Sequence, residues 1–88
     1  MKRDWELIRA ILMAASEIRA GEKLLHTEID GYFPMHVGGH IADLCDTGFL
    51  KAFVVRAHGY VMWASVSAVT REGLILLDRL NRGLVKAS

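Results

Sequence analysis

Apolar positions between Asp4 and Gly21 recur at the spacing of an α-helix. They form one broad stripe suited to face a core: Ile8, Ile11, Leu12, Ala15 and Ile18. Asp4 is a suitable N-terminal cap, Arg19 suits the last turn, and Gly21 is positioned as the stop. The pattern therefore predicts an amphipathic helix that spans most of this segment.

A second helix is predicted over residues 34–47, with Pro34 in its first turn and Gly48 as its stop. One of its faces is apolar: Val37, Ile41 and Leu44. The residues before it, 23–30, fit either a short helix or a short strand. Periodicity over so few residues does not decide between the two.

Two segments rich in β-forming residues follow, 50–57 and 60–67, separated by the two-residue loop His58-Gly59. The face expected to join the core carries three cross-strand pairs: Phe53 with Ala64, Val55 with Met62, and Ala57 with Tyr60. The solvent face carries two: Val54 with Trp63, and Arg56 with Val61. That second face is unusually apolar for an exposed one.

A last helix is predicted over residues 71–82, with Thr70 as its cap. Residues 74–77 are all apolar, so they cannot all point one way. We expect three leucines to pack inward: Leu77, Leu80 and Leu84. Ile75 or Leu76 is then expected to face elsewhere, against a second copy of the chain.

Composition indicates one folded domain over residues 1–88. Hydrophobic residues make up 52% and charged residues 24%, which excludes a disordered chain. The apolar share is high for so small a domain, so we expect apolar surface outside and a homodimer. The formal net charge of +1 argues mildly against a dedicated nucleic-acid binder, which usually carries a basic excess.

Cysteine usage and the absence of a targeting segment favour a cytoplasmic protein. Cys45 is the one cysteine, so no intrachain disulfide can form. Residues 57–70 form the longest stretch without Asp, Glu, Lys or Arg, and it is too short and polar for a membrane helix. We therefore expect no membrane association.

The order helix, short element, helix, hairpin, helix resembles a winged helix-turn-helix domain, in which residues 37–50 match the second helix of the motif and the strand that leaves it. The resemblance implies an α+β fold with a three-helix core, a β-hairpin wing and a C-terminal helix. Residues 1–12, 28–32, 40–50 and 69–78 are similar to one small bacterial and prophage-associated family of domains of unknown function. The wider resemblance implies a transcription regulator that binds double-stranded DNA.

The candidate DNA-binding residues come from the second helix and the hairpin: Met35, His36, Gly38, Gly39, Lys51, Arg56 and His58. The glycine pair would let the backbone approach DNA, and the basic residues would contact phosphates. Base readout relies on forked donors such as Arg, Asn and Gln, and none occurs in residues 35–49. Asp43 and Asp46 would repel phosphate. DNA binding is nevertheless placed first, on the strength of the resemblance.

The alternative is a protein-interaction module, an adaptor or inhibitor, on the same scaffold. Its candidate contact residues are apolar apart from one arginine: Val54, Arg56, Trp63, Ile75 and Leu76. Arg56 beside Trp63 suggests a cation–π pair, and tryptophan with arginine is typical of interface hot spots.

No enzyme and no cofactor is expected. The sequence has no glycine-rich phosphate loop and no nucleophile placed next to a base. His36 and His40 have the helical spacing of a metal-ligand pair, but no third ligand is placed by the sequence. We expect His40 to be a partly buried structural histidine.

Overall fold

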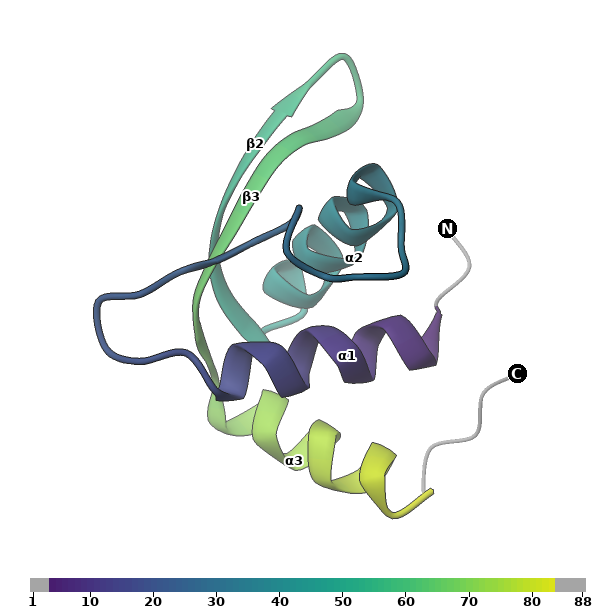
Figure 1. Ribbon diagram of the computed structural model, residues 1–88, viewed down its shortest axis with the longest axis vertical. Helices are drawn as coiled ribbons and strands as arrows, with labels where there is room; N and C mark the ends of the chain where they lie inside the picture. Colours follow the sequence, from purple (N-terminus) through teal and green to yellow (C-terminus); the bar gives the residue numbers. More distant parts are fainter. Residues whose placement is uncertain (1–3, 84–88) are drawn as a thin grey trace.

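The computed structural model describes residues 4–83 and combines helices with an antiparallel sheet (Figure 1). The elements follow in this order: α1 (Trp5–Ser16), β1 (Leu24–Leu25), α2 (Pro34–Asp46), β2 (Leu50–Ala57), β3 (Tyr60–Val69) and α3 (Arg71–Asn81). The strand order is β1-β3-β2, and the three helices of the described range lie on one side of the sheet. The predicted α+β class is confirmed, and the arrangement is compatible with a winged-helix-like fold.

Helix α1 begins as predicted and ends earlier than predicted. The Asp4 carboxylate accepts a hydrogen bond from the Leu7 backbone N–H at 3.1 Å, which satisfies one unpaired donor of the first turn. The helix ends at Ser16, whose hydroxyl donates to the Met13 carbonyl oxygen at 2.7 Å. The next backbone hydrogen bonds, from Glu17 to Ala14 and from Ile18 to Ala15, span three residues instead of four, so the α-helix ends here. The prediction that Arg19 closes this helix is therefore wrong.

The undecided segment 23–30 contains the short strand β1 and no helix. His26 extends the pairing of β1 with β3, because its backbone N–H donates to the Ala64 carbonyl oxygen at 3.0 Å. The His26 imidazole Nδ1 also accepts the Ala64 backbone N–H at 3.2 Å. Turns connect His26 to Phe33. In a helix-turn-helix motif, a short turn joins the two helices. In the described residues, the helix before α2 is α1, which ends at Ser16, so no short turn joins a helix to the start of α2.

Helix α2 has its predicted limits because local signals set both ends. Pro34 occupies the first turn, where a missing N–H removes no hydrogen bond. Gly48 follows the helix with a φ of 87°, a conformation that favours glycine. Its buried side carries the predicted apolar residues and three more: Val37, Gly38, His40, Ile41, Ala42 and Leu44.

The β2–β3 hairpin turns at His58 and Gly59, as predicted. Both residues have positive φ, 53° and 80°, as in the type I′ turns that suit two-residue hairpin loops. The register beyond the turn is irregular. Arg56 pairs with Val61, but the next pair joins Val55 to Trp63, so Met62 is an extra residue, a β-bulge in β3.

The bulge separates residues that simple alternation places on one face. Val54, predicted to face solvent with Trp63, packs against the core instead. Phe53 and Val55, predicted to join the core with Ala64, are 63% and 40% exposed. Strand β2 is regular, so its whole alternation runs opposite to the prediction, and Val61, on the turn side of the bulge, also packs against the core instead of facing solvent. The extra residue shifts β3 relative to β2, so Ala64 and Trp63 keep their predicted faces. Both predictions for these β2 residues are therefore wrong.

Helix α3 starts at the predicted cap, where the Thr70 hydroxyl oxygen accepts the Gly73 backbone N–H at 3.1 Å. Gly73 lets this helix approach the start of β2 closely, because a Cβ at this position would collide with the Phe49 carbonyl oxygen. A backbone hydrogen bond from the Thr70 N–H to the same Phe49 carbonyl, at 3.1 Å, fixes the contact.

The apolar residues of α3 point in different directions, as predicted. Leu77 is buried, and Leu76 and Leu80 pack against the core while remaining partly exposed. Leu74 and Ile75 are exposed. Leu84, which was expected to pack inward, lies outside the described residues.

Candidate functional site

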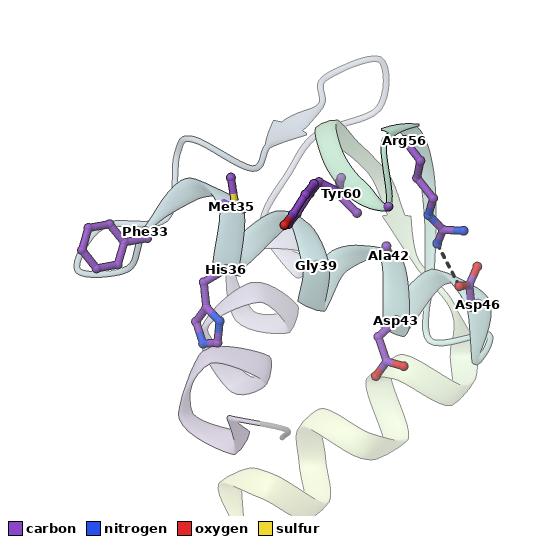
Figure 2. Close-up of a pocket in the computed structure, with 11 residues that line it drawn as sticks. Phe33, Met35, His36, Gly39, Ala42, Asp43, Asp46, Arg56 and Tyr60 are labelled. Atoms are coloured by element: carbon purple, nitrogen blue, oxygen red, sulfur yellow. Dashed lines mark hydrogen bonds and ion pairs between the residues drawn. The ribbon is translucent and has the colours of Figure 1, made fainter. Parts of the chain in front are cut away.

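A groove lies between the outward side of α2 and the tip of the β2–β3 hairpin (Figure 2). Its volume is about 770 Å³, within the range of typical ligand pockets. Residues of both elements and of the loop before α2 line it: Phe33, Met35, His36, Gly39, Ala42, Asp43, Asp46, Arg56, Gly59, Tyr60 and Val61.

Large apolar side chains stand exposed around this groove. Met35 on α2 is 61% exposed, Tyr60 on the hairpin is 59% exposed, and Phe33 at the outer end is more exposed still. Figure 2 shows Met35 and Tyr60 on neighbouring walls and Phe33 pointing away from them. Exposed apolar side chains grouped around a concave surface are typical of an interaction site.

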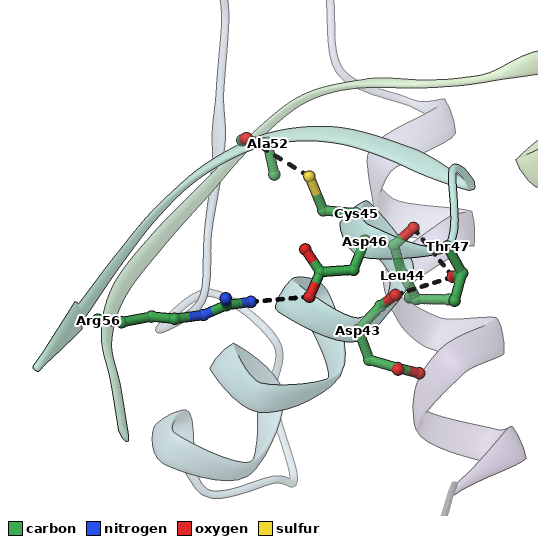
Figure 3. A network of polar contacts seen from close by, with 7 residues as sticks. All are labelled: Asp43, Leu44, Cys45, Asp46, Thr47, Ala52 and Arg56. Atoms are coloured by element: carbon green, nitrogen blue, oxygen red, sulfur yellow. Dashed lines mark hydrogen bonds and ion pairs between the residues drawn. The ribbon is translucent and has the colours of Figure 1, made fainter. Parts of the chain in front are cut away.

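The other end of the groove is acidic. Asp43 and Asp46 line it from the last turns of α2, with the Asp46 side chain directed toward Arg56 and the Asp43 side chain pointing away from that pair (Figure 3). The Arg56 Nη2 atom lies 2.9 Å from the Asp46 Oδ2 atom, in an ion pair whose two side chains are both exposed. Arg56 therefore does not form the predicted cation–π pair. Trp63 instead packs edge-to-face against Phe53, with ring centroids 6.0 Å apart.

The width of the groove depends on a close contact between its walls. Gly38 is buried, and a Cβ at this position would lie 3.2 Å from the Val61 Cγ1 atom, tighter than ordinary van der Waals contact. The glycine thus allows the hairpin to rest directly on α2. Gly38 is consequently not available to DNA, and its prediction as a DNA-binding residue is wrong.

His40 anchors α2 beneath the groove. Its side chain is buried, with 1% exposure, and its Nε2 atom accepts the Asp4 backbone N–H at 3.1 Å. The ring therefore carries its proton on Nδ1, which donates to the His36 carbonyl oxygen at 3.0 Å. Both ring nitrogens are engaged, which confirms a structural role. Within residues 4–83, no group of three or more potential ligands is placed to hold a metal ion.

Beside the start of α2, a small cluster of polar groups surrounds the groove entrance. The His36 Nε2 atom lies 3.9 Å from the Asp4 Oδ2 atom. Desolvation by burial, followed by the charges of Asp4 and Glu6, raises the pKa of Tyr32 above its ordinary value of 10.0. Tyr32 is therefore a neutral hydroxyl at neutral pH and adds no charge to the entrance.

A family model described as hypothetical protein (DUF2513) matches residues 2–83. The chain belongs to the DUF2513 family. No curated protein and no solved structure matches the chain. Membership confirms the predicted resemblance to a small family, while the family description names no activity. In this DUF2513 chain, no helix of the described part is both long and apolar enough to cross a membrane.

The structure brings only some of the candidate DNA-binding residues together. Four of the seven line the groove: Met35, His36, Gly39 and Arg56. His58 lies exposed in the hairpin turn, and Lys51 lies near the opposite end of β2. The predicted basic residues of this DUF2513 chain therefore do not converge on the groove.

The candidate interface residues do not share one surface either. Trp63 lies on the outer face of the sheet, whereas Val54 packs inward and Arg56 reaches Asp46. Ile75 and Leu76 belong to α3, where they line a separate small hollow with Phe49, Glu72 and Arg79.

The two aromatic residues of the groove, Phe33 and Tyr60, were not predicted as site residues from the sequence. Both stand next to turn signals, Phe33 before Pro34 and Tyr60 after Gly59. This signal was present in the sequence, but the sequence gives no indication that the two turns lie near the same groove.

Proposed function

We propose that this protein is a non-enzymatic protein-interaction module that binds a peptide segment in the groove between α2 and the hairpin tip. One observation carries the proposal: the α2 side of the groove begins with the exposed apolar Met35 and ends with Asp43 and Asp46. Among the groove residues of the described chain, Arg56 is the one Arg or Lys, and it is bonded to Asp46.

DNA binding by a winged helix, which the sequence places first, has weaker support. Phosphate contacts need cations, whereas this groove presents the carboxylates of Asp43 and Asp46. Gly38 lies against Val61, so only Gly39 of the glycine pair lines the groove. DNA binding therefore stays a prediction that the experiment below also tests.

The chemistry of the groove specifies the partner. Met35 and Tyr60 offer apolar contacts on two walls, so the bound segment needs at least one large apolar side chain. The exposed Asp46 carboxylate favours a neighbouring lysine or arginine in the same segment. A peptide with an apolar anchor followed by a basic residue matches both requirements.

To test the proposal, peptides are selected from a random phage-displayed library on the immobilised protein. The binding site of the selected peptides is then mapped by nuclear magnetic resonance. We expect selected peptides to combine apolar and basic residues and to shift the amide signals of Gly39, Gly59 and Val61. The substitution Met35→Glu should weaken binding by at least roughly tenfold, which corresponds to about 1.4 kcal/mol.

Leu74→Glu is the matched control, because Leu74 is also an exposed apolar residue on a helix but lies outside the groove. Binding should be unchanged in this variant. Titration of a labelled random DNA duplex at several salt concentrations tests the alternative. Steep salt-dependent binding that shifts the same amide signals, with no peptide selected, would reject the proposal and favour DNA.

A further inference from the structure

No described helix covers the outer face of the sheet, because all three lie on the opposite side (Figure 1). Ser65, opposite Phe53 on this face, is buried, with 2% exposure, whereas its larger neighbours are exposed. An antiparallel sheet with one solvated face usually carries polar residues there. This outer face instead carries Phe53, Val55 and Trp63, each more than a third exposed.

Phe53 and Trp63 form the centre of this surface, which we call the outer patch together with Val55. Their rings meet edge-to-face at 65°, a favourable geometry for aromatic pairs. Around them, the outward positions of β2 and β3 are nearly uncharged. Lys51, near the start of β2, is the one charged residue among them in the described strands.

Strand β2 is also the free edge of the sheet, since the order is β1-β3-β2. Both irregularities of the pairing, at Met62 and Ser67, place the extra residue in β3, so β2 itself is regular. Proteins commonly protect an exposed edge with bulges or several charges. Here the edge strand has no bulge, and Lys51 is its one outward charge.

We infer that a second copy of this chain covers the outer patch, sheet against sheet, in a symmetric dimer. A two-fold axis places the same patch on both sides, which suits an apolar surface that carries little charge. Lys51 lies at one end of the patch. An antiparallel arrangement therefore puts the two lysines at opposite ends, where they do not repel each other.

The area of the patch sets the expected strength. With aromatic side chains of about 200 Å² each, exposures of 63% and 38% leave on the order of 200 Å² on Phe53 and Trp63. A standard interface buries about 800 Å² on each partner. The aromatic pair thus supplies the centre of an interface but not its whole area, so we expect a weak dimer.

Sedimentation equilibrium over a range of protein concentrations tests the inference, with Trp63 fluorescence as a local probe. The wild-type protein should form a dimer, and its tryptophan emission should shift to shorter wavelength as the dimer forms. Phe53→Lys should raise the dimer dissociation constant by at least roughly tenfold. Leu74→Lys, at an exposed apolar position on α3, is the matched control and should change it little.

Three outcomes would overturn the inference. The wild-type protein could stay monomeric at millimolar concentration, which leaves the patch to a different protein. Leu74→Lys could weaken the dimer as much as Phe53→Lys does, which places the contact on α3. Both variants could leave the dimer intact. The inference does not rest on the proposed function, because Met35→Glu removes a groove residue and should leave the dissociation constant unchanged.

Discussion

The tip and the middle of the hairpin present two apolar surfaces that differ in shape and charge. At the tip, Tyr60 faces α2 across a concave groove that ends in carboxylates. In the middle, Phe53 and Trp63 form an outer patch with a single lysine near its end. A concave, charged surface selects a partner with complementary charge, whereas an apolar surface with one charge at its end suits a copy of itself.

This difference shows how one hairpin can present two separate interfaces. The side chains of a strand alternate between faces, so a single strand pair supplies both surfaces without sharing residues. Arg56 points inward to Asp46, and its neighbour Val55 points outward. Substitutions on the two faces should therefore act independently, because well-separated sites have nearly additive effects.

The largest effect is expected from Gly73→Ala, which disturbs the packing of α3 against the start of β2, the strand that contributes to both surfaces. The new Cβ would collide with the Phe49 carbonyl oxygen, so α3 must move away from β2. Despite the better helix propensity of alanine, we expect a loss of at least about 3 kcal/mol in the free energy of unfolding. Urea denaturation measures it. A stability equal to that of the wild type would mean that α3 is not packed here as described.

A smaller effect that separates the two surfaces is expected from Gly38→Leu. The added side chain meets Val61 and pushes the hairpin tip from α2, at a cost of roughly 2 kcal/mol of stability. Peptide binding in the groove should be lost, while dimerisation through the outer patch should persist. Leu74→Glu, on α3 and outside the groove, is the control and should leave peptide binding unchanged.

If Gly38→Leu abolished dimerisation as well, the two surfaces would be coupled through the hairpin, and the comparison above would fail. If it left peptide binding intact, the bound segment would lie elsewhere. The two assays, peptide titration and sedimentation, therefore have to be made on the same protein sample.

Local chemistry made much of this fold predictable. Asp4 and Thr70 cap their helices as the sequence predicts, and Pro34 and Gly48 delimit α2. The hairpin turn was predictable for the same reason, because His58 and Gly59 suit the positive φ that the turn needs. Each of these signals acts within a few residues of where it stands.

Features that depend on contacts between distant segments were not predictable. Strand β1 exists because Leu24 and Leu25 pair with β3, and nothing within residues 23–30 distinguishes that pairing from a helical turn. The bulge at Met62 carries no local signal, and it changes which residues of β3 lie opposite those of β2. Gly38 was predicted to approach DNA because glycine is small. In the structure, the close neighbour that requires a glycine at this position is Val61.

The candidate site was predictable only in part, for the same reason. Met35, His36 and Gly39 follow from helical spacing once α2 is placed, and they do line the groove. Their opposite wall comes from the hairpin, and its geometry depends on how the sheet packs on α2. The acidic end was visible in the sequence as Asp43 and Asp46, and it already argued against phosphate.

The smallest effect on stability is expected from breaking the Arg56–Asp46 ion pair. This change also tests most directly whether the charge of the groove contributes to binding. Both side chains are more than half exposed, so Arg56→Ala should change the free energy of unfolding by less than about 1 kcal/mol. The same substitution removes the positive charge that pairs with the Asp46 carboxylate. A cationic peptide should therefore bind more tightly to the variant, and the gain should shrink as salt is added.

Asp46→Asn should have the opposite effect on the same peptide, with an equally small change in stability, and neither variant should alter the dimer dissociation constant. A peptide that bound both variants and the wild type equally at low salt would show that the acidic end does not contact it. The groove would then act through its apolar walls alone. In that case the two surfaces of the hairpin would differ only in shape, and Met35 and Tyr60 would have to account for all selectivity between partners.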